Sequence, residues 1–502
     1  MNVIGLDFGS HHASIALWNE EKDRIEVIAD DLGSRTIPTI VAYRGDEILT
    51  GQAALSQQHK NSNNTYEDIR STYILNNDTD ANSTINVEAL DNKEIKLSDL
   101  SQHFFRNIHN QVKMQVGNVV RETVICLPSS MSMNEDAKKK LIDVAQQGGI
   151  RVKAVIDDST AICLAYGLDQ SETCNYGKVI VIDMGWSKTE VSAFEIKGGV
   201  LFPCGSTTIN TISGNIIVDL VVKHCCKDFK RKTKMDCSES NRSLVRLTRE
   251  CEALVKALST GTEATITIDS LYEGCDYSGK ISRARFDDLC AIPFMQFKNS
   301  LTSFLESINT SSGNGWSNTD ITHVLLGGGM TSIPKSQSFL KSFFSTADFP
   351  KPGKGQANSI STTAEAQAVG AALHARIICL EGLLDKFVKI PDAEEMSCLP
   401  VGLNICSEGS GDNGEQSAVL VSEGTPLPTS IYMTVGTDES SCYFKLTDTN
   451  DNNLADIVFN SSGGDCKINV SISESCDIHL EVVHTSDKDG SNPLAIVDIP
   501  AV

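Results

Sequence analysis

Two aspartates occur in the same short pattern, which is suited to holding a metal ion together with a phosphate. The segments Val3–Gly9 and Val179–Gly185 are apolar runs that each end in Asp-x-Gly, with Asp7 and Asp183 at matching positions. An aliphatic run predicts a buried strand, so each carboxylate is expected at a strand end. The glycine that follows lets the chain turn and brings backbone N–H groups close to an anion.

The two copies lie 176 residues apart, which predicts a duplicated, two-lobed domain that binds a metal-phosphate group between its halves. A single Asp-x-Gly is more often a solvent-facing turn, so it is the duplication that favours a binding site. A third glycine cluster, Gly327–Gly329, follows the apolar run Val324–Leu326 and precedes a helix expected from about Pro334. Two interpretations stay open for it: a backbone wall against a flat ligand such as an adenine ring, or a tight strand-to-helix turn.

The hydrophobic pattern indicates the elements that position these residues. Strands and turns dominate residues 1–43, helical spacing covers Leu97–Val116 and Asn134–Gln147, and the strand Thr123–Leu127 lies between these helices. Alternation of strands and helices repeats in the second half, which predicts an α/β fold. After about residue 396, short strands alternate with Gly, Asn, Asp and Ser turns, as in a small all-β module.

Composition limits the class of protein. The chain has 502 residues, 40% of them hydrophobic and 22% charged, and a net charge of −22. So acidic a surface argues against direct binding of nucleic acid or an anionic membrane, because such binding needs clustered Lys and Arg. No secretory signal or membrane-spanning run is expected. The sixteen cysteines contain no Cys-x-x-Cys pair and are interpreted as reduced thiols of a cytosolic protein.

Two adjacent histidines, His11 and His12, occupy the expected tip of the first hairpin. Neighbouring side chains on such a tip usually point apart, which disfavours a shared metal site. We expect them to be exposed turn residues or neutral donors facing a phosphate.

Six segments, in order along the chain, resemble the heat shock protein 70 chaperone family, and the resemblance covers about residues 1–380. They are Val3–Gly9, Ile28–Pro38, Leu164–Asp169, Ile268–Gly274, Ile281–Phe286 and Gly328–Lys335. The chain looks most similar to the short, divergent members that act at the ribosome with a J-domain partner, the human-type member fourteen and the fungal Ssz-type proteins.

This resemblance implies an actin-like ATPase domain of two lobes over residues 1–382, with the second lobe from about residue 178. A linker at 383–396 and a truncated β-sandwich substrate-binding domain at 397–502 would follow, without a helical lid. The segment Gly424–Pro428 matches a turn of that β domain, whereas the family's acidic interdomain segment is not recognisable around Leu383–Phe387. ATP or ADP with Mg²⁺ is the implied ligand.

The resemblance also assigns residues to roles. The metal ion is expected to be held through water by Asp7 and Asp183. The positions that match the family's catalytic residues are Arg70, Asp158 and Asp183. The positions that match its nucleotide-binding residues are Asp7, Gly9, Ser10, His11, His12, Gly185, Ser187, Lys188, Gly214, Glu252, Lys256, Ser259, Gly328 and Gly329.

Several of these positions depart from the family pattern in ways that predict weak or absent hydrolysis. Arg70 stands where the family has a lysine that positions the attacking water, and a guanidinium is bulkier than an ammonium. Asp158 and Ser159 stand where the family has Glu and Pro. Trp186 and Ser187 replace two phosphate-binding glycines.

On the adenosine side the pattern is mixed. Glu252, Lys256 and Ser259 match, but Val255 replaces a lysine and Ser332 replaces an arginine that stacks on adenine. Loss of that stacking predicts binding weaker by about 1–2 kcal/mol.

The resemblance therefore predicts an atypical chaperone or co-chaperone. It would bind ATP and act with a zuotin-like J-domain protein and a catalytically active heat shock protein 70 on nascent or unfolded polypeptides. It would be cytosolic, ribosome-associated through that partner, and linked to the stress response. The alternative is a fully active ATP-hydrolysing chaperone. A sugar kinase or actin-like polymer is disfavoured by the appended β domain.

Overall fold

The computed structural model divides into two compact units, residues 1–383 and 384–502. The expected linker and the turn Gly424–Pro428 lie wholly or mostly outside the described residues. The structure describes residues 3–19, 22, 24–30, 33–74, 83–116, 122–129, 134–168, 176–197, 200–308, 315–352, 360–384, 403–407, 416–421, 429–437, 441–448, 452–461, 463–473, 476–485 and 493–500.

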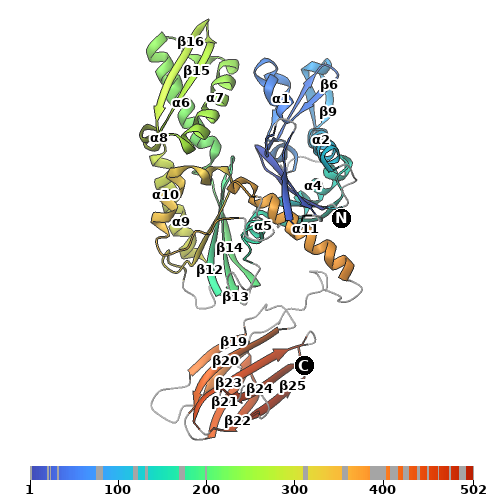
Figure 1. Cartoon of the computed structure of the whole chain (residues 1–502), viewed down its shortest axis with the longest axis vertical. Coiled ribbons are helices and arrows are strands. Elements are labelled where there is room, and N and C mark those ends of the chain that lie inside the picture. Colours follow the sequence, from blue (N-terminus) through green and yellow to red (C-terminus); the bar gives the residue numbers. More distant parts are fainter. Residues whose placement is uncertain are drawn as a thin grey trace. The chain divides into compact units, whose positions relative to one another are not determined.

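Unit 1 contains two lobes, each built on a sheet with an Asp-x-Gly strand in its interior (Figure 1). In the first lobe, β1 is antiparallel to β2 and parallel to β10, and the strand order is β11-β10-β1-β2-β3. These strands are β1 (Val3–Phe8), β2 (His12–Asn19), β3 (Arg24–Ile28), β10 (Glu122–Leu127) and β11 (Val152–Asp157). The expected strands and hairpin of this lobe are confirmed.

The sheet of the second lobe repeats these neighbours. Strand β12 is antiparallel to β13 and parallel to β17, in the order β14-β13-β12-β17. The strands are β12 (Tyr176–Met184), β13 (Thr189–Lys197), β14 (Val200–Ile209) and β17 (His323–Gly327). Asp7 and Asp183 therefore occupy equivalent positions, each one residue before the end of its strand, and the predicted duplication is confirmed.

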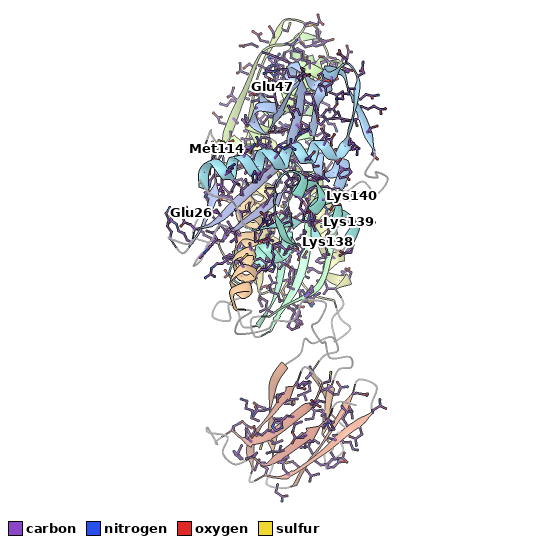
Figure 2. All side chains as sticks on the ribbon, turned by 90° about the vertical axis from the view of Figure 1, so that its right-hand side faces the viewer. Glu26, Glu47, Met114, Lys138, Lys139 and Lys140 are labelled. Atoms are coloured by element: carbon purple, nitrogen blue, oxygen red, sulfur yellow. The ribbon has the colours of Figure 1, made fainter. Side chains whose placement is uncertain are left out.

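Helices cover these sheets and join the lobes. In the first lobe α2 (Leu97–Val116) packs against α4 (Glu135–Gln147), and Figure 2 shows Met114 and the three lysines Lys138–Lys140 on the outer side of these helices. Side chains of α5 (Asp158–Ala165) and α11 (Ala366–Leu384) share one buried core with strands of both sheets. In Figure 1, α11 is the orange helix that runs past both lobes.

Further elements complete each lobe. The first lobe carries β4 (Ile37–Pro38), β5 (Ile40–Arg44), β6 (Glu47–Thr50), α1 (Gln52–Gln57), β7 (Thr65–Glu67), β8 (Thr84–Val87) and β9 (Lys93–Lys96). The second lobe carries α6 (Gly214–Thr233), α7 (Asn241–Thr260), β15 (Glu263–Tyr272), β16 (Cys275–Ser282), α8 (Arg283–Leu289), α9 (Ala291–Ser307) and α10 (Pro334–Phe343).

Unit 2 consists of two four-stranded antiparallel sheets, in the orders β19-β18-β21-β22 and β20-β23-β24-β25. Alternate residues such as Ile468, Val470 and Ile472 point into a common core. No helix occurs among the described residues between 403 and 500. Within the described chain, no helix has the length and apolar character needed to cross a membrane. The strands are β18 (Leu403–Ser407), β19 (Gln416–Val421), β20 (Thr429–Thr437), β21 (Ser441–Asp448), β22 (Asn453–Asn460), β23 (Gly464–Ile472), β24 (Ile478–His484) and β25 (Ala495–Ile499).

Candidate functional site

A cavity of about 260 Å³ lies between the two lobes of unit 1, and both Asp-x-Gly turns line it. Sixteen of the seventeen residues assigned from the resemblance lie on its wall; the exception is Gly214, which packs beneath Trp186. The sixteen are Asp7, Gly9, Ser10, His11, His12, Arg70, Asp158, Asp183, Gly185, Ser187, Lys188, Glu252, Lys256, Ser259, Gly328 and Gly329. The fold therefore brings together residues that are up to 322 positions apart.

Two glycines of the cavity wall are required by close backbone contacts. A Cβ on Gly9 would lie 2.3 Å from the carbonyl oxygen of His12, so no larger residue fits this turn. Gly328 has φ +74°, and a Cβ there would lie 2.4 Å from the Met184 carbonyl oxygen. The third glycine cluster is therefore a tight strand-to-helix turn, and it also forms part of the cavity wall. Its contact with a flat ligand such as an adenine ring stays a prediction.

Three carboxylates face one cation at the base of the cavity. Burial raises the pKa of both Asp7 and Asp183 to about 7, and the charge of Arg70 partly opposes this. Burial, and then repulsion from Asp7 and Asp183, raises the pKa of Asp158 well above its usual range. Arg70 lies in a π-helical turn and donates an Nη1–H to the Phe8 carbonyl oxygen at 2.9 Å.

Unpartnered buried atoms show that this base is suited to a further polar group. Within the part of the chain that the structure describes, Asp158 Oδ1, Asp183 Oδ1 and Arg70 Nε are buried without a hydrogen-bond partner. The described residues contain no group of three or more His, Cys, Asp or Glu side chains arranged to hold a metal ion. Buried carboxylate oxygens without a partner suit a hydrated cation such as Mg²⁺. That Asp7 and Asp183 hold this ion through water stays a prediction.

An aromatic stack connects the two lobes across the mouth of the phosphate loops. The rings of His11 and Trp186 are parallel within 10°, with centroids 3.9 Å apart. His11 Nε2 also lies 3.4 Å from Glu252 Oε2 on α7. His11 is therefore enclosed by the second lobe, because both of these partners come from there.

The expectation that His11 and His12 point apart is wrong. Their ring centroids are 4.4 Å apart in an edge-to-face arrangement. Burial, and then the positive charges of His11 and Lys256, lowers the pKa of His12 well below its usual value, so His12 is neutral. The alternative of an exposed turn residue is also wrong for His11, whose ring is covered by Trp186.

The second phosphate loop is tied to neighbouring side chains. Ser10 Oγ donates to Ser187 Oγ at 3.2 Å, and Lys188 Nζ lies 2.6 Å from Glu190 Oε1. Lys188, on the cavity wall, therefore forms an ion pair with Glu190. A Cβ on Gly214 would lie 2.8 Å from Trp186 Cε3, so this glycine makes room for the indole.

Sequence reasoning missed a hydroxyl cluster that links the lobes beside the carboxylates. Ser159 Oγ lies 2.5 Å from Ser129 Oγ in the first lobe and 2.7 Å from Ser192 Oγ in the second. The Ser129 backbone N–H donates to Glu190 at 2.8 Å. The sequence marks Ser159 only as a lost proline, and nothing local in it marks the two partners.

The end of the cavity that the resemblance assigns to the nucleoside combines α7 with the glycine-rich turn. Lys256 and Ser259 of α7 lie on the wall with Val255, and a Cβ built on Gly329 would meet no described atom within 4 Å. Ser332, where an arginine was expected from the family, instead approaches Thr363 with its hydroxyl, at 3.4 Å. Other lining residues that the sequence did not mark include Thr36, Met330, Ile333 and Gln367.

The fold and site define an actin-like phosphate-binding domain, with two related lobes that enclose a carboxylate-based cavity. A family model described as Hsp70 protein matches residues 3–398. The chain is 31% identical to a heat shock protein of the SSB type from Pyricularia oryzae over 85% of this chain and 68% of that protein. It is 29% identical to the ribosome-associated molecular chaperone SSB of Candida glabrata over 88% of this chain and 72% of that protein. It is 31% identical to heat shock 70-related protein 5 of Dictyostelium discoideum over 68% of this chain and 70% of that protein.

The chain belongs to the heat shock protein 70 family, a family of nucleotide-binding chaperones. The predicted fold class and family are confirmed. The similarity to Ssz-type proteins and to human-type member fourteen stays a prediction, because the names of the relatives above give neither type.

Proposed function

We propose that this protein is an atypical heat shock protein 70 chaperone that binds ATP or ADP and hydrolyses ATP weakly or not at all. It assists the folding of nascent polypeptides in a ribosome-associated complex, together with a zuotin-like J-domain partner and a catalytically active heat shock protein 70. Several relatives are named ribosome-associated molecular chaperones, which supports the ribosomal setting. A cytosolic, ribosome-associated location and a part in the stress response belong to the same proposal.

The observation that carries the proposal is how the side chains of the second phosphate loop, Trp186 and Lys188, are held. Trp186 stacks on His11, and Lys188 is held by Glu190, so this loop directs neither glycine N–H groups nor a free ammonium into the gap between the lobes. Transition states of phosphoryl transfer depend on positioned donors and cations. Weak ATP hydrolysis is expected because this loop lacks such donors and such a cation.

A nucleotide that binds here would bring Mg²⁺ to the carboxylates. Mg²⁺ would neutralise phosphate charge, with Asp7 and Asp183 holding its waters. Arg70, which is 5% exposed and fixed on the Phe8 carbonyl, would contribute a permanent positive charge at the base. Lys256 and Ser259 would face the adenosine.

The alternative is a fully active ATPase. It is favoured by one observation: Asp7 and Asp183 keep equivalent positions at the ends of β1 and β12 and both line the cavity. The second phosphate loop departs from the family pattern, whereas Asp7 and Asp183 keep it.

Single-turnover hydrolysis of radiolabelled ATP, with and without a J-domain protein, separates the two. We expect a slow rate of ATP hydrolysis that the J-domain protein does not raise. Loss of working phosphate donors costs about 10²–10³-fold in rate, and in this protein that loss has already occurred. Asp183→Asn should therefore change the remaining rate by no more than about threefold. A stimulated turnover that Asp183→Asn abolishes would establish the active-chaperone alternative.

Ribosome association is expected to depend on the partner. A net charge of −22 repels the ribosomal RNA surface, and screening at physiological salt acts over about 8 Å. The purified protein alone should stay in the supernatant when ribosomes are pelleted, and should pellet when the J-domain protein is added. Pelleting of the isolated protein at about 150 mM salt, which is physiological ionic strength, would contradict this.

A further inference from the structure

The contacts between the two phosphate loops form a connected set, which we name the interlobe latch and define as Ser10, His11, Trp186, Ser187 and Glu252. It contains one ring stack, one imidazole–carboxylate contact and one hydroxyl hydrogen bond. Each contact joins the first lobe to the second. The latch therefore holds the lobes together at the position where the phosphates of a nucleotide would otherwise bridge them.

The phosphate end of the cavity, behind the latch, is unfavourable for a polyphosphate that Mg²⁺ does not accompany. Asp7, Asp158 and Asp183 lie there, and their main positive neighbour is Arg70. Lys188 Nζ is already within 2.6 Å of a carboxylate oxygen. A triphosphate brings several negative charges into this environment, and it must also displace the stacked rings to reach backbone N–H groups.

The nucleoside end of the same cavity is accessible without such a displacement. Gly329 leaves open space, and Val255, Met330 and Ile333 supply apolar walls around Lys256. The total volume of about 260 Å³ is below the range of about 300–1,000 Å³ that is usual for ligand pockets. A compact ligand with an apolar ring and a few polar groups suits this end better than an extended triphosphate.

We propose that the latched protein selects a neutral purine nucleoside, and that ATP binds only after the His11–Trp186 stack opens. This inference rests on the proposed function, because it uses the same adenine site. It adds to that function an order of ligand affinities: the latch lowers the affinity for phosphates and leaves the affinity for the nucleoside unchanged.

Isothermal titration calorimetry of the full chain with adenosine, ADP and ATP, each with Mg²⁺, tests the preference. We expect the wild type to bind adenosine at least as tightly as ATP. Trp186→Gly and His11→Ala remove the stack from opposite lobes, and each is expected to tighten ATP at least tenfold relative to adenosine. Trp186→Phe keeps an aromatic face and should restore the ratio toward the wild-type value.

The result that would overturn the latch is an ATP-to-adenosine affinity ratio that neither Trp186→Gly nor His11→Ala changes. A wild type that binds ATP more than tenfold tighter than adenosine would also overturn it, while leaving the proposed ATP site intact. Absence of binding by all three ligands to the wild type and both variants would overturn the proposed nucleotide site itself. Circular dichroism of each variant verifies that the comparison concerns folded protein.

Discussion

Replacement of Gly370 by alanine is expected to lower the free energy of unfolding of unit 1 by about 3 kcal/mol or more, the upper part of the range for overpacking. Alanine ordinarily stabilises a helix interior by about 1 kcal/mol relative to glycine. At this position in α11, however, a Cβ would lie 1.8 Å from the Ala161 carbonyl oxygen and 2.4 Å from its carbonyl carbon. Both atoms belong to the backbone of α5, so the clash is relieved only if one helix moves.

The three tryptophans of the chain provide the measurement, because Trp18, Trp186 and Trp316 all lie in unit 1. Urea unfolding followed by their fluorescence therefore reports on this unit alone. Gly329→Ala is the matched control: its Cβ meets no described atom within 4 Å, and a change below about 1 kcal/mol is expected. Equal stability of the two variants would contradict the close approach of α11 to α5.

The close approach also explains why the lobes share one core. Gly5 in β1 also lies too close to α11 for a larger residue, since a Cβ there would lie 2.2 Å from the Ala368 carbonyl oxygen. Small residues at Ala371, Ala372 and Ala375 are fully buried along the same helix. A helix with small side chains can lie against a strand and another helix at once, and so α11 holds both sheets near the cavity.

The fold was predictable because its signals are local. Each Asp-x-Gly follows an apolar strand, and the helical spacing predicts α2 with the bounds Leu97–Val116 that the structure has. The duplicated pattern predicts the repeated sheet topology, because equivalent strands need equivalent neighbours. Signals of this kind depend on residues that are close together in the chain, within one or two helical turns, and can therefore be read directly from the sequence.

The condition of the site was not predictable, because it depends on contacts between distant residues. The sequence shows that Trp186 is too large for a phosphate loop, but its stacking on His11 joins residues 175 positions apart. One contact is local: Lys188 and Glu190 are two residues apart, but only the structure shows that their side chains meet as an ion pair. The sequence shows which side chains differ from the family pattern. It does not show which residues these side chains contact, because the fold determines those contacts.

The buried carboxylates lead to the second large effect, a pH-dependent stabilisation by Asp183→Asn. The pKa of Asp183 is raised from 3.8 to about 7 in the folded protein. A raised carboxyl pKa contributes stability that is fully present below about pH 4 and is lost as pH rises through about 7. Asparagine does not ionise, so the stability of the variant relative to the wild type should increase by about 3 kcal/mol between about pH 5 and pH 8.

Urea unfolding of unit 1 at about pH 5, 6.5 and 8 measures this difference, with Glu26→Gln as the control. Hydrogen bonds from Lys22 and Arg24 lower the pKa of Glu26 to about 2, and Figure 2 shows Glu26 at the edge of the first lobe. Glu26 does not line the cavity. A lowered carboxyl pKa gives stability that is lost only as pH falls through about 2, so Glu26→Gln should differ from the wild type by a constant amount from about pH 5 to pH 8. If Asp183→Asn showed the same flat difference, the carboxylate would be ionised throughout this range. The base of the cavity would then be able to hold a cation without releasing a proton.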